Sequence, residues 1–398
     1  MNYKLLKHNI MKTYTILIIL GFTLLALFPS CEKTDDALPY TNCNIDENIN
    51  HPNAANYQKI IDDFLAAGVP GVSVTVLSPE GTWNKAGGKA DLKNNIDLTP
   101  CHALRGGSTT KVFAATTILI LQDEGVLSID DKINKYIPSS ITDNIENAND
   151  VTIKQLLNMT SGIKDYLGLK STLGTLNLSN EKKSAEENLE TIYNKSANFN
   201  PGEEILYSNS NYLLAALVIK YATGKTANEV IQEKLIDRLG LSSTYVSTAT
   251  PENLARCYYD IYDNGYMKDV TEIDMNAVGG EDMLDGGIIT CSNDLTIFLE
   301  ALMTGEILSE NSLNQMQEFI DVTQDLGSID YVTKYGLGLM YLETENGIAI
   351  GHYGTIYAFN CVFLYFPEKE VTVAFMINGW SGDISKVFNS EDIFKHLF

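Results

Sequence analysis

A serine and a lysine three residues apart, Ser108 and Lys111, begin the strongest helical pattern in the chain. From residue 108 to residue 124, alanine, leucine and isoleucine recur at helical spacing, and Gly125 follows as a stop signal. Serine is a preferred N-cap, because its oxygen accepts a hydrogen bond from a free N–H group of the first turn. Residues three apart share one face of a helix, so we expect the ammonium of Lys111 to lie beside the hydroxyl of Ser108.

A cation is unfavourable at this end of a helix, because the N-terminal end carries a positive partial charge. A capping box would place glutamate where this chain has Lys111. The helix dipole and burial both disfavour the charged form of the lysine and lower its pKa. Such a lysine can take the proton of a nucleophilic serine. The alternative is a capping serine beside a solvated lysine, a combination that often occurs by chance.

Strand-like segments at both ends of the chain flank a mostly helical middle. Hydrophobic periodicity predicts helices over 56–67, 153–159, 185–194, 211–223, 227–239, 294–303 and 383–398, and strands over 72–77, from about 83, and over 335–342, 347–353, 360–366 and 371–377. The economical arrangement is an α+β fold with one antiparallel sheet built from both ends of the chain. The terminal helices would cover one face, and residues from about 126 to 285 would form a helical lobe. A site would lie where the helix from Ser108 meets the sheet.

Composition excludes several classes of partner. The chain has 398 residues, 44% of them hydrophobic, and a formal charge of −23. This acidity makes it a poor ligand for nucleic acid or an anionic membrane surface. The six cysteines and five histidines are scattered and lack the spacing of metal ligands, so we expect neither a metal nor a cofactor. The cysteine spacing names no disulfide pair, and buried apolar thiols are the default.

Residues 1–31 have the pattern of a secretion signal. Three lysines precede an apolar run over 15–28, which is too short for a spanning helix. Cys31 follows this run directly after a small residue, as at a bacterial lipoprotein processing site, which predicts lipidation of Cys31. The alternative is ordinary signal cleavage, with Cys31 incidental.

The polar stretch over 32–53 is typical of a flexible tether, and residues 54–398 would form the folded domain. We therefore expect a protein secreted across the inner membrane, either periplasmic or attached to the outer membrane as a lipoprotein. It would contact the membrane only through its N-terminal lipid.

Three short segments resemble, in order, the S-x-x-K, Y-x-N and K-T-G or H-x-G motifs of the serine β-lactamases and penicillin-binding proteins. They are Ser108–Lys111, Tyr207–Asn209 and His352–Gly354. The flanking segments 151–166, 200–224 and 286–290 are also similar, and the resemblance spans about residues 55 to 378. It implies the β-lactamase/transpeptidase-like fold. This group includes class C β-lactamases, D-alanyl-D-alanine carboxypeptidases, and related esterases and D-amino-acid peptidases.

The resemblance also implies roles for individual residues. Ser108 would be the nucleophile that forms an acyl-enzyme, and Lys111 its general base or proton shuttle. Tyr207 would be a second candidate base if cationic neighbours lowered the pKa of its phenol. The alternative for Tyr207 is a buried core tyrosine. Asn209 would hydrogen-bond Lys111 and the substrate amide, or else serve as a turn residue before the next helix.

The third motif would complete the site. The backbone N–H groups of Ser108 and Thr355 would form the oxyanion hole, and Gly354 would let the strand approach the substrate closely. His352 departs from the lysine that is usual in class C β-lactamases and is closer to the carboxypeptidase branch. Tyr353 replaces a small hydroxyl residue that helps to bind a substrate carboxylate, so it would either narrow the cleft or turn outward.

The sequence thus predicts a serine hydrolase that forms an acyl-enzyme on Ser108 and needs no cofactor. D-alanyl-D-alanine carboxypeptidase-like activity, or a related peptidase or esterase activity, is favoured by His352 together with Thr355. The alternatives are a class C-like β-lactamase and a penicillin-binding sensor or binding protein without turnover. The substrate would be a small molecule or a peptide, and the oligomeric state is left open.

Overall fold

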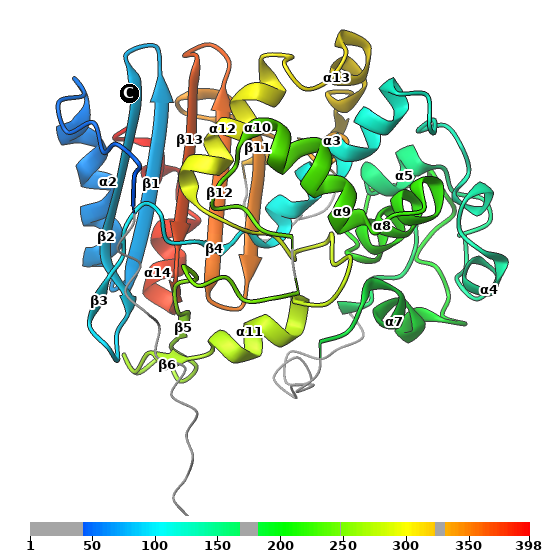
Figure 1. Cartoon of the computed structure of the whole chain (residues 1–398), viewed down its shortest axis with the longest axis horizontal. Coiled ribbons are helices and arrows are strands. Elements are labelled where there is room, and N and C mark those ends of the chain that lie inside the picture. The colour runs from blue at the N-terminus through cyan, green and yellow to red at the C-terminus, as the bar shows by residue number, and fades with distance from the viewer. Residues whose placement is uncertain (1–42, 168–181, 247, 323–330) are drawn as a thin grey trace, which may run out of the picture. The chain divides into compact units, whose positions relative to one another are not determined.

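A computed structural model describes residues 43–398 of the chain, except 168–181, 247 and 323–330. The centre of this part is an antiparallel sheet with the strand order β3-β2-β1-β13-β12-β11-β10-β9-β8 (Figure 1). Its strands are β1 Gly71–Ser78, β2 Gly81–Asp91, β3 Ile96–Asp97, β8 Ile320–Asp321, β9 Val332–Tyr335, β10 Met340–Thr344, β11 Gly347–Ile356, β12 Phe359–Phe366 and β13 Val371–Ile377. Strands from both ends of the chain meet where β1 pairs with β13, which confirms the predicted sheet.

Helices cover both faces of the sheet, so its central strands are buried on both sides. On one face lie α2 (Ala54–Ala66), α14 (Gly382–Phe388) and the short helix η6 (Glu391–Phe394). Phe375 of β13 contacts aromatic rings of α2 and η6 on this face. On the other face, α12 (Ser292–Met303) lies against β1, β12 and β13, and its Phe298 contacts Phe363 of β12.

Most of the remaining helices lie beside the sheet (Figure 1), and two of them, α3 (Thr110–Asp123) and α13 (Glu310–Met316), fall outside the range of about 126–285 expected for the helical lobe. The others are α4 Ser139–Thr142, α5 Ile153–Leu157, α7 Ala185–Leu189, α8 Ser210–Thr223, α9 Ala227–Ile231, α10 Asp237–Leu239 and α11 Thr271–Val278. Two helices of this whole group are buried along nearly their whole length: α3 and α8. A helix that is apolar all round belongs in a core, and α3 packs between α8 and α12, where the rings of Phe113 and Phe298 stack.

Small strand pairs connect the lobe to the sheet. β4 (Leu104–Arg105) pairs with β7 (Ile289–Thr290) immediately before the turn that carries Ser108. β14 (Gly379–Trp380) pairs with β5 (Tyr258–Tyr259), which pairs with β6 (Lys268–Asp269). Because β4 and β14 both contact β12, these pairs hold the chain before Ser108 and the segment 258–269 against the sheet.

Two predicted elements are interrupted. The expected strand over 335–342 is two strands, β9 and β10, joined by a turn in which Gly336 donates its N–H to the carbonyl of Leu339. Gly338 has a positive φ of +77° in this turn, a conformation that glycine adopts without strain. The expected terminal helix over 383–398 ends at Phe388, because Ser390 caps a new short helix, η6.

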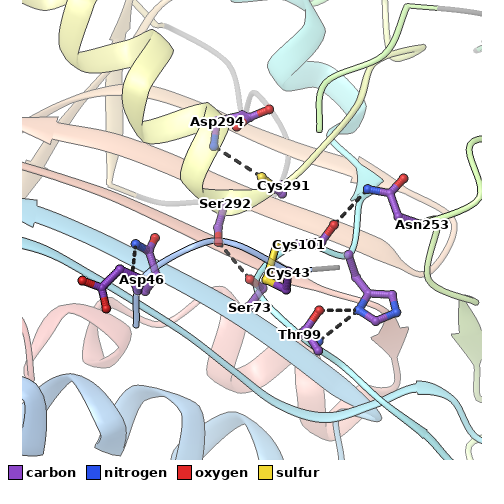
Figure 2. The surroundings of a disulfide bond; sticks show 11 residues. Cys43, Asp46, Ser73, Thr99, Cys101, Asn253, Cys291, Ser292 and Asp294 are labelled. Carbon is purple, nitrogen blue, oxygen red and sulfur yellow. Dashed lines mark hydrogen bonds between the residues drawn. A yellow bond between two sulfur atoms is a disulfide. The ribbon is translucent and has the colours of Figure 1, made fainter. Parts of the chain in front are cut away.

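The expected default of free thiols is wrong for two cysteines. Cys43 and Cys101 form a disulfide (Figure 2), with their Cα atoms 5.3 Å apart. Cys257, Cys291 and Cys361 are buried and form no disulfide, as expected. Scattered spacing cannot reveal a pair that is 58 residues apart in sequence.

The first described residues lie against the sheet. The side-chain amide of Asn84 donates to the backbone carbonyl of Asp46, and that of Asn48 donates to the carbonyl of Thr82, both at 3.0 Å. With the disulfide, these bonds anchor the segment 43–53, so the stretch left for the expected tether ends before Cys43. The expected signal segment and Cys31 lie outside the described residues. Among the helices that the structure describes, none is long and apolar enough to span a bilayer.

Candidate active site

A close backbone approach positions Ser108 against strand β11. Ser108 lies in the 3₁₀ turn η1 (Gly107–Thr109), which packs on β11. A Cβ atom added to Gly354 would lie 1.8 Å from the carbonyl oxygen of Gly106, and one added to Gly107 would lie 2.8 Å from the backbone nitrogen of Thr355. Glycine at these positions therefore lets the backbones of Ser108 and Thr355 come together, as the predicted oxyanion hole requires.

Ser108 is not the N-cap of the helix, so that prediction is wrong. Helix α3 starts one residue later, with Thr109 at the N-cap position and no side-chain cap. The hydroxyl of Thr109 donates to the carbonyl of Gly106 at 2.9 Å, and the hydroxyl of Thr110 donates to the carbonyl of Gly107 at 2.6 Å. The two threonines thus stabilise the turn, which leaves the Ser108 hydroxyl available for other partners.

Lys111 is fully buried beside this hydroxyl. Its ammonium donates to Oγ of Ser108 at 3.1 Å, to Oδ1 of Asn209 at 3.0 Å and to the backbone carbonyl of Asp285 at 2.6 Å. Burial lowers the pKa of Lys111 to about 8, against the opposing effect of the carboxylates of Asp285 and Asp165. The predicted contact and the predicted direction of the pKa shift are both present.

Tyr207 and Asn209 lie just before α8 and face the same lysine. Nζ of Lys111 lies 4.9 Å from the centroid of the Tyr207 ring, and the neighbouring Ser108 side chain acts to lower the pKa of the Tyr207 phenol. Despite this cationic neighbour, burial raises the pKa of Tyr207 well above its usual range. The backbone and side-chain N–H groups of Asn209 donate to the carboxylate of Asp165, at 3.0 and 3.3 Å, which directs the amide oxygen of Asn209 towards Lys111.

His352 is fully buried, and both of its ring nitrogens have partners. Nδ1 bonds the backbone carbonyl of Tyr353, and the hydroxyl of Tyr335 lies 3.1 Å from Nε2. A carbonyl oxygen can only accept, so Nδ1 carries the proton and Nε2 accepts from Tyr335. Burial, with a smaller effect of nearby Lys111, lowers the pKa of His352 to about 3, so this imidazole is neutral.

Tyr353 points to the opposite face of the sheet, because successive residues of a strand alternate. Its ring contacts Phe388 of α14, and its hydroxyl lies 2.8 Å from the hydroxyl of Tyr331. Only 4% of the residue is exposed. Tyr353 therefore packs beneath the terminal helices and does not narrow the cleft. Thr355, two residues further along the strand, is exposed.

Two carboxylates near Lys111, those of Asp165 and Asp285, are not among the residues predicted from the sequence. Asp165 orients Asn209, as described above. Asp285 accepts a hydrogen bond from the hydroxyl of Tyr166 at 2.7 Å through Oδ2, whereas its buried Oδ1 has no hydrogen-bond partner. Burial raises the pKa of Asp285. Neither residue belongs to one of the three motifs, although Asp165 ends the similar segment 151–166 and Asp285 precedes the similar segment 286–290.

The described residues contain no cluster of histidine, cysteine and acidic side chains that could hold a metal ion. The arrangement instead combines a serine nucleophile, a buried lysine with a lowered pKa, a protonated phenol and an oriented amide. These are the groups that nucleophilic acyl transfer requires.

Sequence comparisons point to one family. The family model described as "Beta-lactamase" matches residues 57–396. Penicillin-binding protein 4* of Bacillus subtilis (strain 168) is 26% identical over 320 residues, which cover 76% of this chain and 67% of that protein. Protein flp of Staphylococcus aureus (strain N315) is 29% identical over 188 residues, which cover 47% of this chain and 37% of flp. The match thus spans about two thirds of the Bacillus protein and little more than a third of flp.

Solved structures with the same fold include D-stereospecific hydrolases. The D-amino acid amidase from Ochrobactrum anthropi SV3, complexed with L-phenylalanine amide, has a TM-score of 0.75 and 25% identity, covering 87% of this chain and 96% of that one. The D-stereospecific amidohydrolase from a Streptomyces species has a TM-score of 0.71 and 28% identity, covering 85% and 98%. The penicillin-binding protein from Bacillus halodurans, at 20% identity and a TM-score of 0.71, shares the fold over 86% and 99%. By its sequence and its fold, the chain belongs to the β-lactamase family.

Proposed function

We propose that this protein is a serine hydrolase in which Ser108 forms a covalent acyl-enzyme. The observation that carries the proposal is the 3.1 Å contact between Oγ of Ser108 and Nζ of the fully buried Lys111. Because the pKa of Lys111 is about 8, about a tenth of the lysine is neutral at pH 7 and can accept a proton.

In the acylation step, Oγ of Ser108 attacks the carbonyl carbon of the substrate while its proton passes to neutral Lys111. The N–H groups of Ser108 and Thr355 stabilise the negative charge that develops on the carbonyl oxygen. The bond to the leaving group then breaks, and the leaving group takes up the proton. Water next attacks the acyl carbon and gives its proton back by the same route, which releases the acid and restores the serine hydroxyl.

Tyr207 suits the role of proton donor better than that of base. The raised pKa of its phenol keeps it protonated in the resting enzyme, and the effect of Ser108 on this pKa supports a position close to the reacting oxygen. The phenol can therefore relay the proton from Lys111 to the leaving group. Asn209 would hold Lys111 in place and bind the substrate amide.

The cleaved bond in this proposal is an amide, peptide or ester bond, as in D-alanyl-D-alanine carboxypeptidases and related peptidases and esterases. The similarity to a D-amino acid amidase and a D-stereospecific amidohydrolase supports this reaction class.

We also propose secretion and lipid attachment at Cys31. The Cys43–Cys101 disulfide is compatible with an oxidising compartment. If the lipid proposal holds, Cys31→Ser moves the protein from the membrane fraction to the soluble fraction; an unchanged distribution contradicts it.

Labelling with a fluorescent fluorophosphonate and a fluorescent penicillin tests the acyl-enzyme. We expect at least one of them to add its mass to the peptide that contains Ser108, and the label to be absent from Ser108→Ala. If the wild type takes up neither label, the proposal fails. Turnover of nitrocefin, a D-alanyl-D-alanine peptide, a D-amino acid amide and a p-nitrophenyl ester then separates the substrate classes. An acyl-enzyme that persists without product would instead identify a sensor.

A further inference from the structure

Binding a substrate carboxylate beside the cleaved bond requires a cation or free hydrogen-bond donors at the third motif. Among the residues that the structure describes, the third motif offers no cation. His352 is neutral and fully buried, and both of its ring nitrogens are occupied by Tyr335 and the backbone of Tyr353. Charging this imidazole would require breaking the bond from Tyr335 and placing a positive charge near Lys111 in a buried site.

The hydroxyl of the next residue is also withdrawn from the site. Tyr353 lies on the opposite sheet face, where its hydroxyl bonds that of Tyr331. The tyrosine pair is enclosed by the rings of Phe388 and Phe394. Thr355, the residue after the motif, is exposed, but strand alternation puts its side chain on the same face as Tyr353 and away from His352.

The charged groups that the structure places around Ser108 do not supply the carboxylate-binding donors that the third motif lacks. Lys111 directs its hydrogen bonds at Ser108, Asn209 and the carbonyl of Asp285, and in the proposed mechanism it is neutral when it acts. The other two charges that act on it come from carboxylates, those of Asp165 and Asp285. At pH 7 Lys111 is mostly an ammonium, but its charge is opposed by these carboxylates and its hydrogen bonds are already used, so an anionic group on the substrate would find few free donors.

We propose that this site selects amides and esters that carry no carboxylate on the leaving group. Amino acid amides, carboxamide-terminated peptides and neutral esters belong to this substrate class, whereas peptides that end in a free D-alanine are poor substrates. The inference rests on the proposed acyl-enzyme function and narrows it, away from carboxypeptidase action.

A matched substrate pair tests this selectivity. N-acetyl-D-alanyl-D-alanine and its C-terminal carboxamide differ only in the charge of the leaving group, which is released as D-alanine or as D-alaninamide. We expect kcat/KM, measured by mass spectrometry of the released amine, to be roughly tenfold or more higher for the carboxamide. Raising the salt concentration should reduce the ratio of kcat/KM between the carboxamide and the carboxylate, because salt screens the repulsion of the carboxylate. Equal rates, or a preference for the carboxylate, overturn the proposal.

A second pair keeps the test decisive if both peptides are too slow. Phenyl acetate and meta-carboxyphenyl acetate place the same charge difference on a better leaving group, and the same order of kcat/KM is expected. Failure of the proposed function has a different signature, because fluorophosphonate labelling that depends on Ser108 would then be absent.

Tyr353→Phe is the matched control variant. It removes the hydroxyl that bonds Tyr331 and leaves the ring in place. We expect the ratio of kcat/KM between carboxamide and carboxylate to stay unchanged, with the melting temperature reporting any loss of stability. If the variant loses kcat/KM for the carboxylate substrate alone, the Tyr353 hydroxyl binds that carboxylate and the proposal is wrong.

Discussion

At the scale of single residues, the unusual feature is a fully buried lysine. Lys111 exchanges hydration for three oxygen acceptors, and burial still lowers its pKa. The carboxylates of Asp165 and Asp285 oppose the shift, because negative charge favours the ammonium form. The pKa of Lys111 is thus set by a balance between burial and two acidic residues.

This balance predicts a pH profile. For the wild type, kcat/KM should rise with pH and level off above about 8, as Lys111 loses its proton. Asp285→Asn removes one carboxylate that favours the ammonium, so the pKa of Lys111 falls and the rising limb moves to lower pH. The asparagine oxygen can still accept from Tyr166, which keeps the local geometry. A limb that stays in place or moves to higher pH in this variant would contradict the assignment of Lys111 as base.

At the scale of elements, the site depends on the packing of the turn η1 on strand β11. Gly354→Ala should abolish this packing, because its Cβ would lie 1.8 Å from a backbone oxygen. We expect a loss of about 100-fold or more in kcat, since misplacing a reacting group by about 1 Å has an effect of this size. Steady-state kinetics on the fastest ester substrate would measure the loss.

Gly286→Ala is the control for this variant, because the nearest atom to its added Cβ would be 3.6 Å away. The melting temperature of Gly286→Ala should therefore be close to that of the wild type, and that of Gly354→Ala should be lower. If Gly354→Ala is as active as the wild type, then catalysis does not depend on the close approach of strand β11 to the turn η1.

The elements that could be predicted from sequence are those whose local signals agree with their surroundings. Helix α8 has a continuous apolar run and ends at Gly224, which adopts the left-handed conformation of a C-cap. The turn at Gly338 and the break before Ser390 interrupt apolar patterns that continue on both sides. Periodicity alone therefore predicts one strand in place of β9 and β10, and one helix in place of α14 and η6.

In the candidate site, too, some residues could be predicted from local sequence signals and others could not. Ser108, Lys111, Tyr207, Asn209 and His352 lie in three motifs, whose order and surroundings predicted that they would meet. Asp165 and Asp285 act through tertiary contacts with Asn209, Tyr166 and Lys111, and a single sequence contains no sign of such contacts. The sequence alone does not decide the orientation of Tyr353, because strand alternation assigns a face only after the pairing of β11 is known.

At the scale of the whole molecule, the disulfide links the start of the described chain to the segment that leads into the site. The loop that it closes spans 58 residues. Closing such a loop restricts the unfolded chain, so we expect the Cys43→Ser, Cys101→Ser double variant to lose about 2–4 kcal/mol of unfolding free energy. Urea denaturation with and without reductant would measure this difference. Reductant should not affect the double variant, and an equal effect on both proteins would point to the buried thiols instead.

The same closed loop has a consequence for proteolytic damage. Helix α2 and strands β1 and β2 lie between the two cysteines, and an exposed turn over 92–95 follows β2. Cleavage in that turn would produce two fragments that sulfur still joins, and the pairing of β1 with β13 would hold the first fragment in the sheet. A nicked molecule would therefore migrate as one band on a non-reducing gel and as two bands after reduction, and its N-terminal end would remain attached to the domain that carries Ser108.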